Sequence, residues 1–123
     1  MIISFSLTLK LAEKLEVPEP LKAGIKTVTR RNWSDKTFDQ ITKAYDQGRK
    51  QHSAWNNCSF VPGACPIGII ELTHRPYWEK LGDMPESDVF AEGNLWASKK
   101  EFIKMLRLPL DKKLCVVRFQ FKQ

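Results

Sequence analysis

The chain has 123 residues, of which 42% are hydrophobic and 11% aromatic. That length accommodates one domain with a real core, and the composition excludes a disordered chain. No run approaches the ~18–20 apolar residues of a membrane span, and the N-terminus lacks the features of a secretory signal, so we expect a soluble, cytoplasmic protein with no membrane partner.

The net charge of +6 is unevenly distributed along the chain. Residues 22–53 carry eight Lys/Arg against three Asp, and residues 98–123 carry eight against two acids. Between them, residues 54–97 hold six acids and two bases. Such segregated basic blocks favour a surface that faces a polyanion such as nucleic acid. The alternative is a small basic protein that binds nothing specific.

The cysteines and histidines do not form a recognised metal-binding or disulfide pattern. Cys58, Cys65 and Cys115 are odd in number, no CxxC is present, and His52 and His74 stand far apart. We therefore expect no metal, no cofactor and no disulfide. Cys115 lies in an alternating apolar segment, which predicts a buried structural thiol.

The N-terminal part is predicted to contain two strands separated by a short helix. Residues 2–9 alternate between apolar and mostly polar side chains, which is typical of a half-buried strand. Residues 19–23 are predicted to form a short helix that ends at Gly24. The β-branched residues of the segment 26–31 favour a second strand.

A helix is predicted next, over Asp35–Arg49, with Ser34 as its N-cap. Its apolar stripe is narrow: Phe38, Ile41 and Tyr45 at helical spacing. We interpret residues 34–53 as a helical insertion that lies over the domain.

The remaining elements alternate between strands and short helices. Strands are predicted over residues 54–57, 67–74 and 114–121, a helical turn over 76–82, a helix over 85–91, and a further helix opened by the capping box Ser98–Glu101. Together the patterns indicate a single α+β domain around a twisted sheet or barrel.

The segment Gly24–Trp33 concentrates the most unusual chemistry in the chain. Lys26, Arg30 and Arg31 are all basic, and an aromatic residue follows at position 33. The segment is either a solvated basic strand edge or a site for a phosphate and a base.

Several segments in order resemble the ASCH domain, a member of the PUA-like group. The resemblance rests on Ser4–Ser6, Ala23–Arg31, Ala54–Trp55, Ile67–Leu72, Asp83–Asp88, Ala91–Gly93 and Val116–Phe119. It implies a PUA-like small mixed β-barrel of about five to six strands with short peripheral helices, spanning residues 1–123 as one domain. It also implies a basic cleft, built around Lys26–Arg31, that binds RNA or a nucleoside. The family's usual Gly-Asp pair is absent, because residues 35–53 occupy that region.

Some members of this family are hydrolases, and the resemblance implies catalytic residues for that alternative. The lysine, threonine and glutamate of small acetylcytidine amidohydrolases fall on Lys26, Thr29 and Glu92. The alternative function is thus an amidohydrolase that deacylates a modified cytidine; a ribonuclease is a third. A basic adaptor for an acidic protein is another possibility, which an exposed apolar patch would favour.

The two main functions make different demands on the same segment. Hydrolysis requires Thr29 as nucleophile and Lys26 as a base with a lowered pKa. On a regular strand these side chains point to opposite faces, so the backbone must bend at Gly24–Lys26. Binding alone requires phosphate contacts and a stacking aromatic. The expected binding residues are Lys26, Arg30, Arg31, Trp33 and Trp55.

Overall fold

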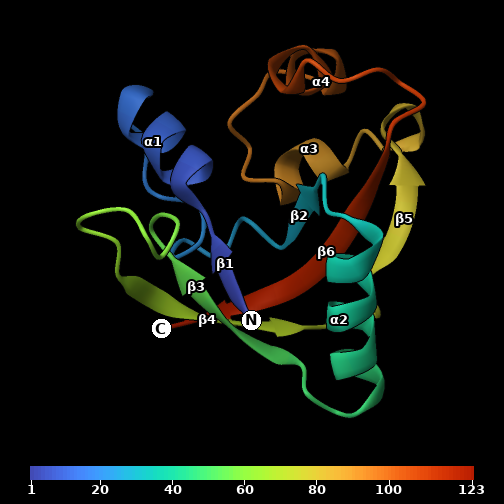
Figure 1. The fold of residues 1–123 in the computed structure, drawn as a ribbon. Helices are drawn as coiled ribbons and strands as arrows, with labels where there is room; N and C mark the ends of the chain where they lie inside the picture. The colour runs from blue at the N-terminus through green and yellow to red at the C-terminus, as the bar shows by residue number, and fades with distance from the viewer.

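The computed structural model describes residues 1–123 and has a mixed α+β fold, as predicted. A six-stranded mixed sheet is curled into a half-barrel and carries four short helices (Figure 1). The elements in order are β1 (Ile2–Ser4), α1 (Ser6–Lys14), β2 (Val28–Arg31), α2 (Asp35–Asp46), β3 (Gln51–Trp55), β4 (Pro66–Leu72), β5 (Tyr77–Lys80), the 3₁₀ turn η1 (Leu81–Asp83), α3 (Asp88–Ala91), α4 (Lys99–Leu106) and β6 (Lys113–Lys122).

The sheet is organised by the long strand β6. The strand order is β1-β3-β4-β6-β2, and β5 also pairs with β6. β1 and β3 run parallel, whereas every other pair is antiparallel. No ladder joins the two outer strands of this path, β1 and β2. The curled sheet therefore stays open along one seam.

Two hydrophobic clusters hold the fold together. The main cluster joins the inner faces of β1, β3, β4 and β6 to Ile41 of α2. The second cluster joins α3, α4 and η1 to Leu114 at the start of β6. Cys115 is fully buried in the main cluster, as predicted, and burial raises the pKa of its thiol to about 12. Because β6 contributes to both clusters, burial of its apolar side chains couples the two halves of the molecule.

The prediction of a strand over residues 2–9 was wrong beyond residue 4. β1 ends at Ser4, and α1 begins at Ser6. The buried side chains of α1 are the small ones, Thr8 and Ala12, which are four residues apart on one helix face. Leu7 and Leu9, which produced the alternating pattern, therefore lie outside the buried face of α1. Their spacing in the sequence made this helix resemble a strand.

Two other local predictions were also wrong. Residues 77–80 form β5, not a helical turn, because their backbone pairs with residues 113–116 of β6. Residues 20–24 form turns and not a helix. In residues 77–80, pairing with β6 overrides a weak helical preference. In residues 20–24, the nearby Pro18 and Pro20 disfavour a helix.

Both predicted serine caps are confirmed. The Ser34 side chain accepts a hydrogen bond from the Thr37 backbone N–H, and the Ser98 side chain accepts one from Glu101. α2 is shorter than predicted and ends at Asp46. Its predicted apolar stripe packs onto the main cluster: Ile41 is completely buried there, and Phe38 and Tyr45 pack against it.

Candidate functional site

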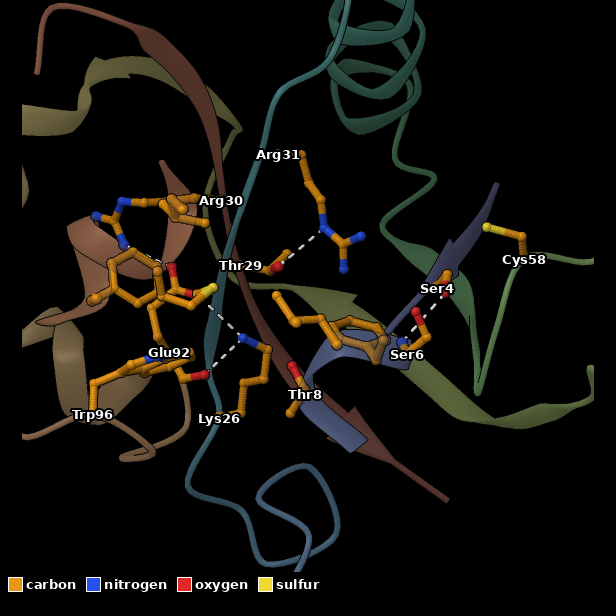
Figure 2. A pocket seen from close by; sticks show the side chains of 15 residues that line it. Ser4, Ser6, Thr8, Lys26, Thr29, Arg30, Arg31, Cys58, Glu92 and Trp96 are labelled. Carbon is orange, nitrogen blue, oxygen red and sulfur yellow. Dashed lines mark hydrogen bonds and ion pairs between the residues drawn. The ribbon is translucent and has the colours of Figure 1, made fainter. Parts of the chain in front are cut away.

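A cavity of about 260 Å³ opens at the seam between the two outer strands. The end of β1 and the start of α1 line one side, and β2 lines the other (Figure 2). Side chains from the segment after α3 and from α4 complete the wall, including Glu92, Trp96 and Phe102. The missing strand pairing thus leaves room for a ligand-sized hollow.

The turn before β2 brings Lys26 into this cavity. Gly24 has a φ of +77°, a left-handed conformation that glycine adopts without strain. The backbone N–H groups of Ile25 and Lys26 then both donate to the Pro20 carbonyl. β2 starts only at Val28, so Lys26 lies outside the strand. The bend that the hydrolytic hypothesis requires is therefore present.

Lys26 and Glu92 form a buried ion pair at the cavity wall. Both residues are 3% exposed. Lys26 Nζ donates to Glu92 Oε1 at 3.1 Å and to the Glu92 carbonyl at 2.8 Å. Burial lowers the pKa of Lys26; Glu92 opposes this shift, and the guanidiniums of Arg31 and Arg30 add to it.

Arg30 points away from Arg31 on the other side of β2, into a cluster of carboxylates (Figure 2). It donates to Glu92 Oε2 and Glu79 Oε1, each at 2.9 Å, and to Asp88. Burial alone would raise the pKa of Asp88, but hydrogen bonds from Arg118 and Arg30 lower it below its usual value.

The charges in this network balance. Three cations, Lys26, Arg30 and Arg118, are joined to the three carboxylates Glu79, Asp88 and Glu92. Balanced, hydrogen-bonded pairs are the form in which charges are tolerated in a protein interior. The Arg30 guanidinium, predicted to contact phosphate, has both terminal nitrogens bound to carboxylates.

Arg31 is the cavity cation that no carboxylate neutralises. Its Nε donates to Thr29 Oγ1 at 3.1 Å, since residues 29 and 31 share one face of β2. Its guanidinium carbon lies 5.1 Å from the centre of the Phe5 ring. Neither terminal nitrogen of Arg31 forms a hydrogen bond or an ion pair within the protein. Burial lowers the pKa of this guanidinium, although its reference value keeps it charged at neutral pH.

The cavity is lined by all three residues of the hydrolytic hypothesis, Lys26, Thr29 and Glu92. The contact between Lys26 and Thr29 that the hypothesis needs is not made. Thr29 Oγ1 accepts its hydrogen bond from Arg31, and Lys26 Nζ is directed to Glu92. No hydrogen bond joins Lys26 to Thr29 (Figure 2).

The opposite wall is polar and comes from the start of α1. The hydroxyl-bearing residues Ser4, Ser6 and Thr8 line the cavity there (Figure 2). The backbone N–H of Ser6 donates to Ser4 Oγ at 3.4 Å, and the first turn of α1 holds no acid. The cavity therefore lies between hydroxyl-bearing side chains and a guanidinium, an arrangement that suits an electron-rich ligand atom.

The tryptophan at the site is not one that the sequence predicted to bind a base. Trp33 and Trp55 do not line the cavity: Trp33 packs against the main cluster, and the Trp55 indole donates to Ser53 Oγ at 2.8 Å. Trp96 lines the cavity instead and packs edge-on against Phe102. No local pattern marked Trp96, which lies in the loop just before the Ser98 cap.

The fold and the site together define a curled-sheet α+β domain with a small, partly enclosed cavity lined by both polar and apolar side chains. Comparison with known protein families, with curated proteins and with solved structures finds no match. No group of three or more metal-ligating side chains is placed to hold an ion. None of the helices has the length and apolarity that crossing a membrane requires.

Proposed function

We propose that the cavity binds a nucleoside, either free or as one unit of RNA. The observation that carries this proposal is the Arg31 guanidinium, whose two terminal nitrogens are unpaired in a cavity that is also lined by the indole of Trp96. A nucleobase presents ring acceptors to such donors and a flat face to an indole. The resemblance of the segments around Lys26–Arg31 to ASCH domains supports the same function.

The size and the polarity of the cavity favour a small ligand. At about 260 Å³ it lies just below the ~300–1,000 Å³ of typical small-molecule sites. Its walls offer donors at Arg31 and acceptors at the hydroxyls of Ser4 and Ser6. A base edge that mixes donors with acceptors can be satisfied on both sides of such a cavity.

Replacement of Arg31 by alanine is expected to weaken binding of cytidine and of N4-acetylcytidine about 5- to 150-fold, because a good contact to a base edge contributes ~1–3 kcal/mol. Calorimetry or Trp fluorescence measures the change. Arg75→Ala is the matched control, since Arg75 pairs with Asp46 on the exposed surface. Equal affinity of the Arg31 and Arg75 variants for both ligands would rule out this contact.

Deacylation of a modified cytidine is the second candidate function. Two observations favour it: Lys26, Thr29 and Glu92 line one cavity, and the pKa of Lys26 is lowered. In this reaction Thr29 Oγ bonds to the acetyl carbon while Lys26 takes its proton. Cytidine then leaves with a proton, and water hydrolyses the acyl-enzyme to acetate. Arg31 is placed to stabilise the negative charge on the carbonyl oxygen.

This reaction requires a rearrangement of the Lys26 side chain. Lys26 Nζ must give up a hydrogen bond to Glu92 before it can reach Thr29 Oγ1. Ribonuclease activity, the third alternative, has no contact in its favour and stays a prediction.

If the protein is a deacylase, Thr29→Ala is expected to reduce release of acetate from N4-acetylcytidine to background, because the nucleophile is removed. Chromatography of the nucleoside product measures turnover. Thr8→Ala is the matched control, since Thr8 is a similarly buried hydroxyl in the same cavity. Turnover retained in the Thr29 variant would exclude Thr29 as the nucleophile, whereas no turnover in the unmodified protein would leave nucleoside binding as the function.

A further inference from the structure

A second hollow lies beside the cavity, on the surface between α1 and α4. It measures about 450 Å³ and shares two lining residues with the cavity, Trp96 and Met105. We call it the α1–α4 groove. In Figure 1 both helices stand above the curled sheet, while α2 lies apart from them at the lower right. The groove and the cavity therefore lie side by side, with Trp96 and Met105 between them.

One wall of the groove is an apolar stripe on α1. Leu11 and Leu15 line the groove, and Leu7, four residues earlier on the same helix face, lines the cavity. Leu7 is 54% exposed and Leu15 is 46% exposed. Because Thr8 and Ala12 provide the buried face of α1, these leucines are left available to contact a ligand.

The other wall comes from α4 and is basic. Lys104 and Arg107 line the groove and are exposed, as is the single acid there, Glu101. Neither Lys104 nor Arg107 belongs to an ion pair, unlike the cations of the buried network. Residues 99–107 as a whole carry four Lys/Arg and one Glu, a net charge of +3. This wall is therefore an unneutralised positive surface.

We propose that the α1–α4 groove holds a single-stranded nucleic acid whose end unit occupies the cavity. The inference rests on the proposed nucleoside site and extends it from a free nucleoside to a strand. Phosphates lie against Lys104 and Arg107, while bases contact the Trp96 indole and the leucine stripe. A cationic rim beside an apolar, aromatic floor is the arrangement by which proteins hold single strands. An acidic peptide offers no flat bases for such a floor, and a free nucleoside leaves the groove empty.

The test compares ligands of increasing length on the intact chain. Cytidine and cytosine-containing RNA and DNA strands of two, four and six nucleotides are titrated at several salt concentrations, with fluorescence anisotropy or calorimetry as readout. The expected result is that affinity rises at least 10-fold from cytidine to the four-nucleotide strand. The RNA and DNA series identify which backbone the groove accepts.

The double variant Lys104→Ala/Arg107→Ala tests the groove itself. Losing two phosphate contacts is expected to flatten the slope of log affinity against log salt by about 1.4 for the four-nucleotide strand, at ~0.7 per contact. Binding of cytidine is expected to stay unchanged. Lys36→Ala/Lys43→Ala on α2 removes the same charge from exposed positions away from the groove and controls for the net charge of the protein.

The outcomes separate the two proposals. Strands that bind no more tightly than cytidine, or equal losses in the α4 and α2 variants, overturn the groove while leaving the nucleoside site standing. Strand binding that depends on Lys104 and Arg107 but not on Arg31 supports the groove and overturns the nucleoside site. Tighter binding of a polyglutamate peptide than of any strand overturns the nucleic-acid assignment.

Discussion

Replacement of Glu92 by alanine is expected to lower the free energy of unfolding by about 3–5 kcal/mol, the usual cost of removing one partner from a buried ion pair. Glu92 is 3% exposed and neutralises both Lys26 and Arg30. Its loss leaves the buried Lys26 without a carboxylate partner. Urea denaturation at pH 7 measures the effect.

Two further variants make this prediction specific. Glu71→Ala removes one partner of an exposed ion pair with Lys122 and is expected to cost only ~0–1 kcal/mol. The double variant Lys26→Met/Glu92→Ala also removes the stranded cation and is expected to recover part of the loss. A Glu92 variant as mildly affected as the Glu71 variant would show that the buried network is not important for stability.

Acid is expected to destabilise the protein through His52 at pH values where carboxylates are still ionised. His52 is 6% exposed, and neither ring nitrogen has a hydrogen-bond partner. Burial, together with the charge of the N-terminal amine, lowers its pKa from 6.5 to about 4. The unfolded chain therefore binds the proton first as pH falls. Stability from this group is fully present above pH ~6.5 and is lost by pH ~4, a change of about 3 kcal/mol at 1.36 kcal/mol per pKa unit.

Urea unfolding between pH 4 and pH 7 tests this dependence. His52→Leu, which cannot be protonated, is expected to flatten the stability profile across that range. His74→Leu is the control, because His74 is exposed and its loss leaves the buried site unchanged. A His52 variant that loses stability in acid as steeply as the unmodified protein would assign the acid sensitivity to other groups.

The sequence correctly predicted those features that depend only on residues close together in the chain. The caps at Ser34 and Ser98 involve residues only three apart, and both are present. The alternating segment near residue 117 is a strand, and its alternate side chains Cys115, Val117 and Phe119 lie in the main cluster. For residues 5–9 the alternating pattern predicted a strand, but these residues lead into and begin helix α1. A short alternating run is also compatible with a helix when the side chains that the helix buries are small.

Only the part of the candidate site that comes from the segment Gly24–Arg31 could be predicted from the sequence. The chain around Gly24 showed where a bend was needed, and the structure has that bend. Arg30 and Arg31 point to opposite sides of β2, as neighbouring residues on a strand do. The acids that neutralise Arg30 lie 49 to 62 residues further along the chain, so no local pattern connects them to it. Trp96 lines the cavity and Trp33 does not, and this depends on how α4 packs in the assembled fold.

The position of β6 has a consequence for how the molecule folds. β6 follows the other five strands in the sequence and pairs with three of them, β2, β4 and β5. During synthesis, β2 remains without its sheet partner through the emergence of some eighty further residues, and such distant pairings slow folding. The seam cavity, which needs β2 in place, therefore cannot exist on a nascent chain that lacks residues 113–122. Until then Arg31 is an ordinary solvated cation, so ligand recognition begins only after β6 has joined the sheet.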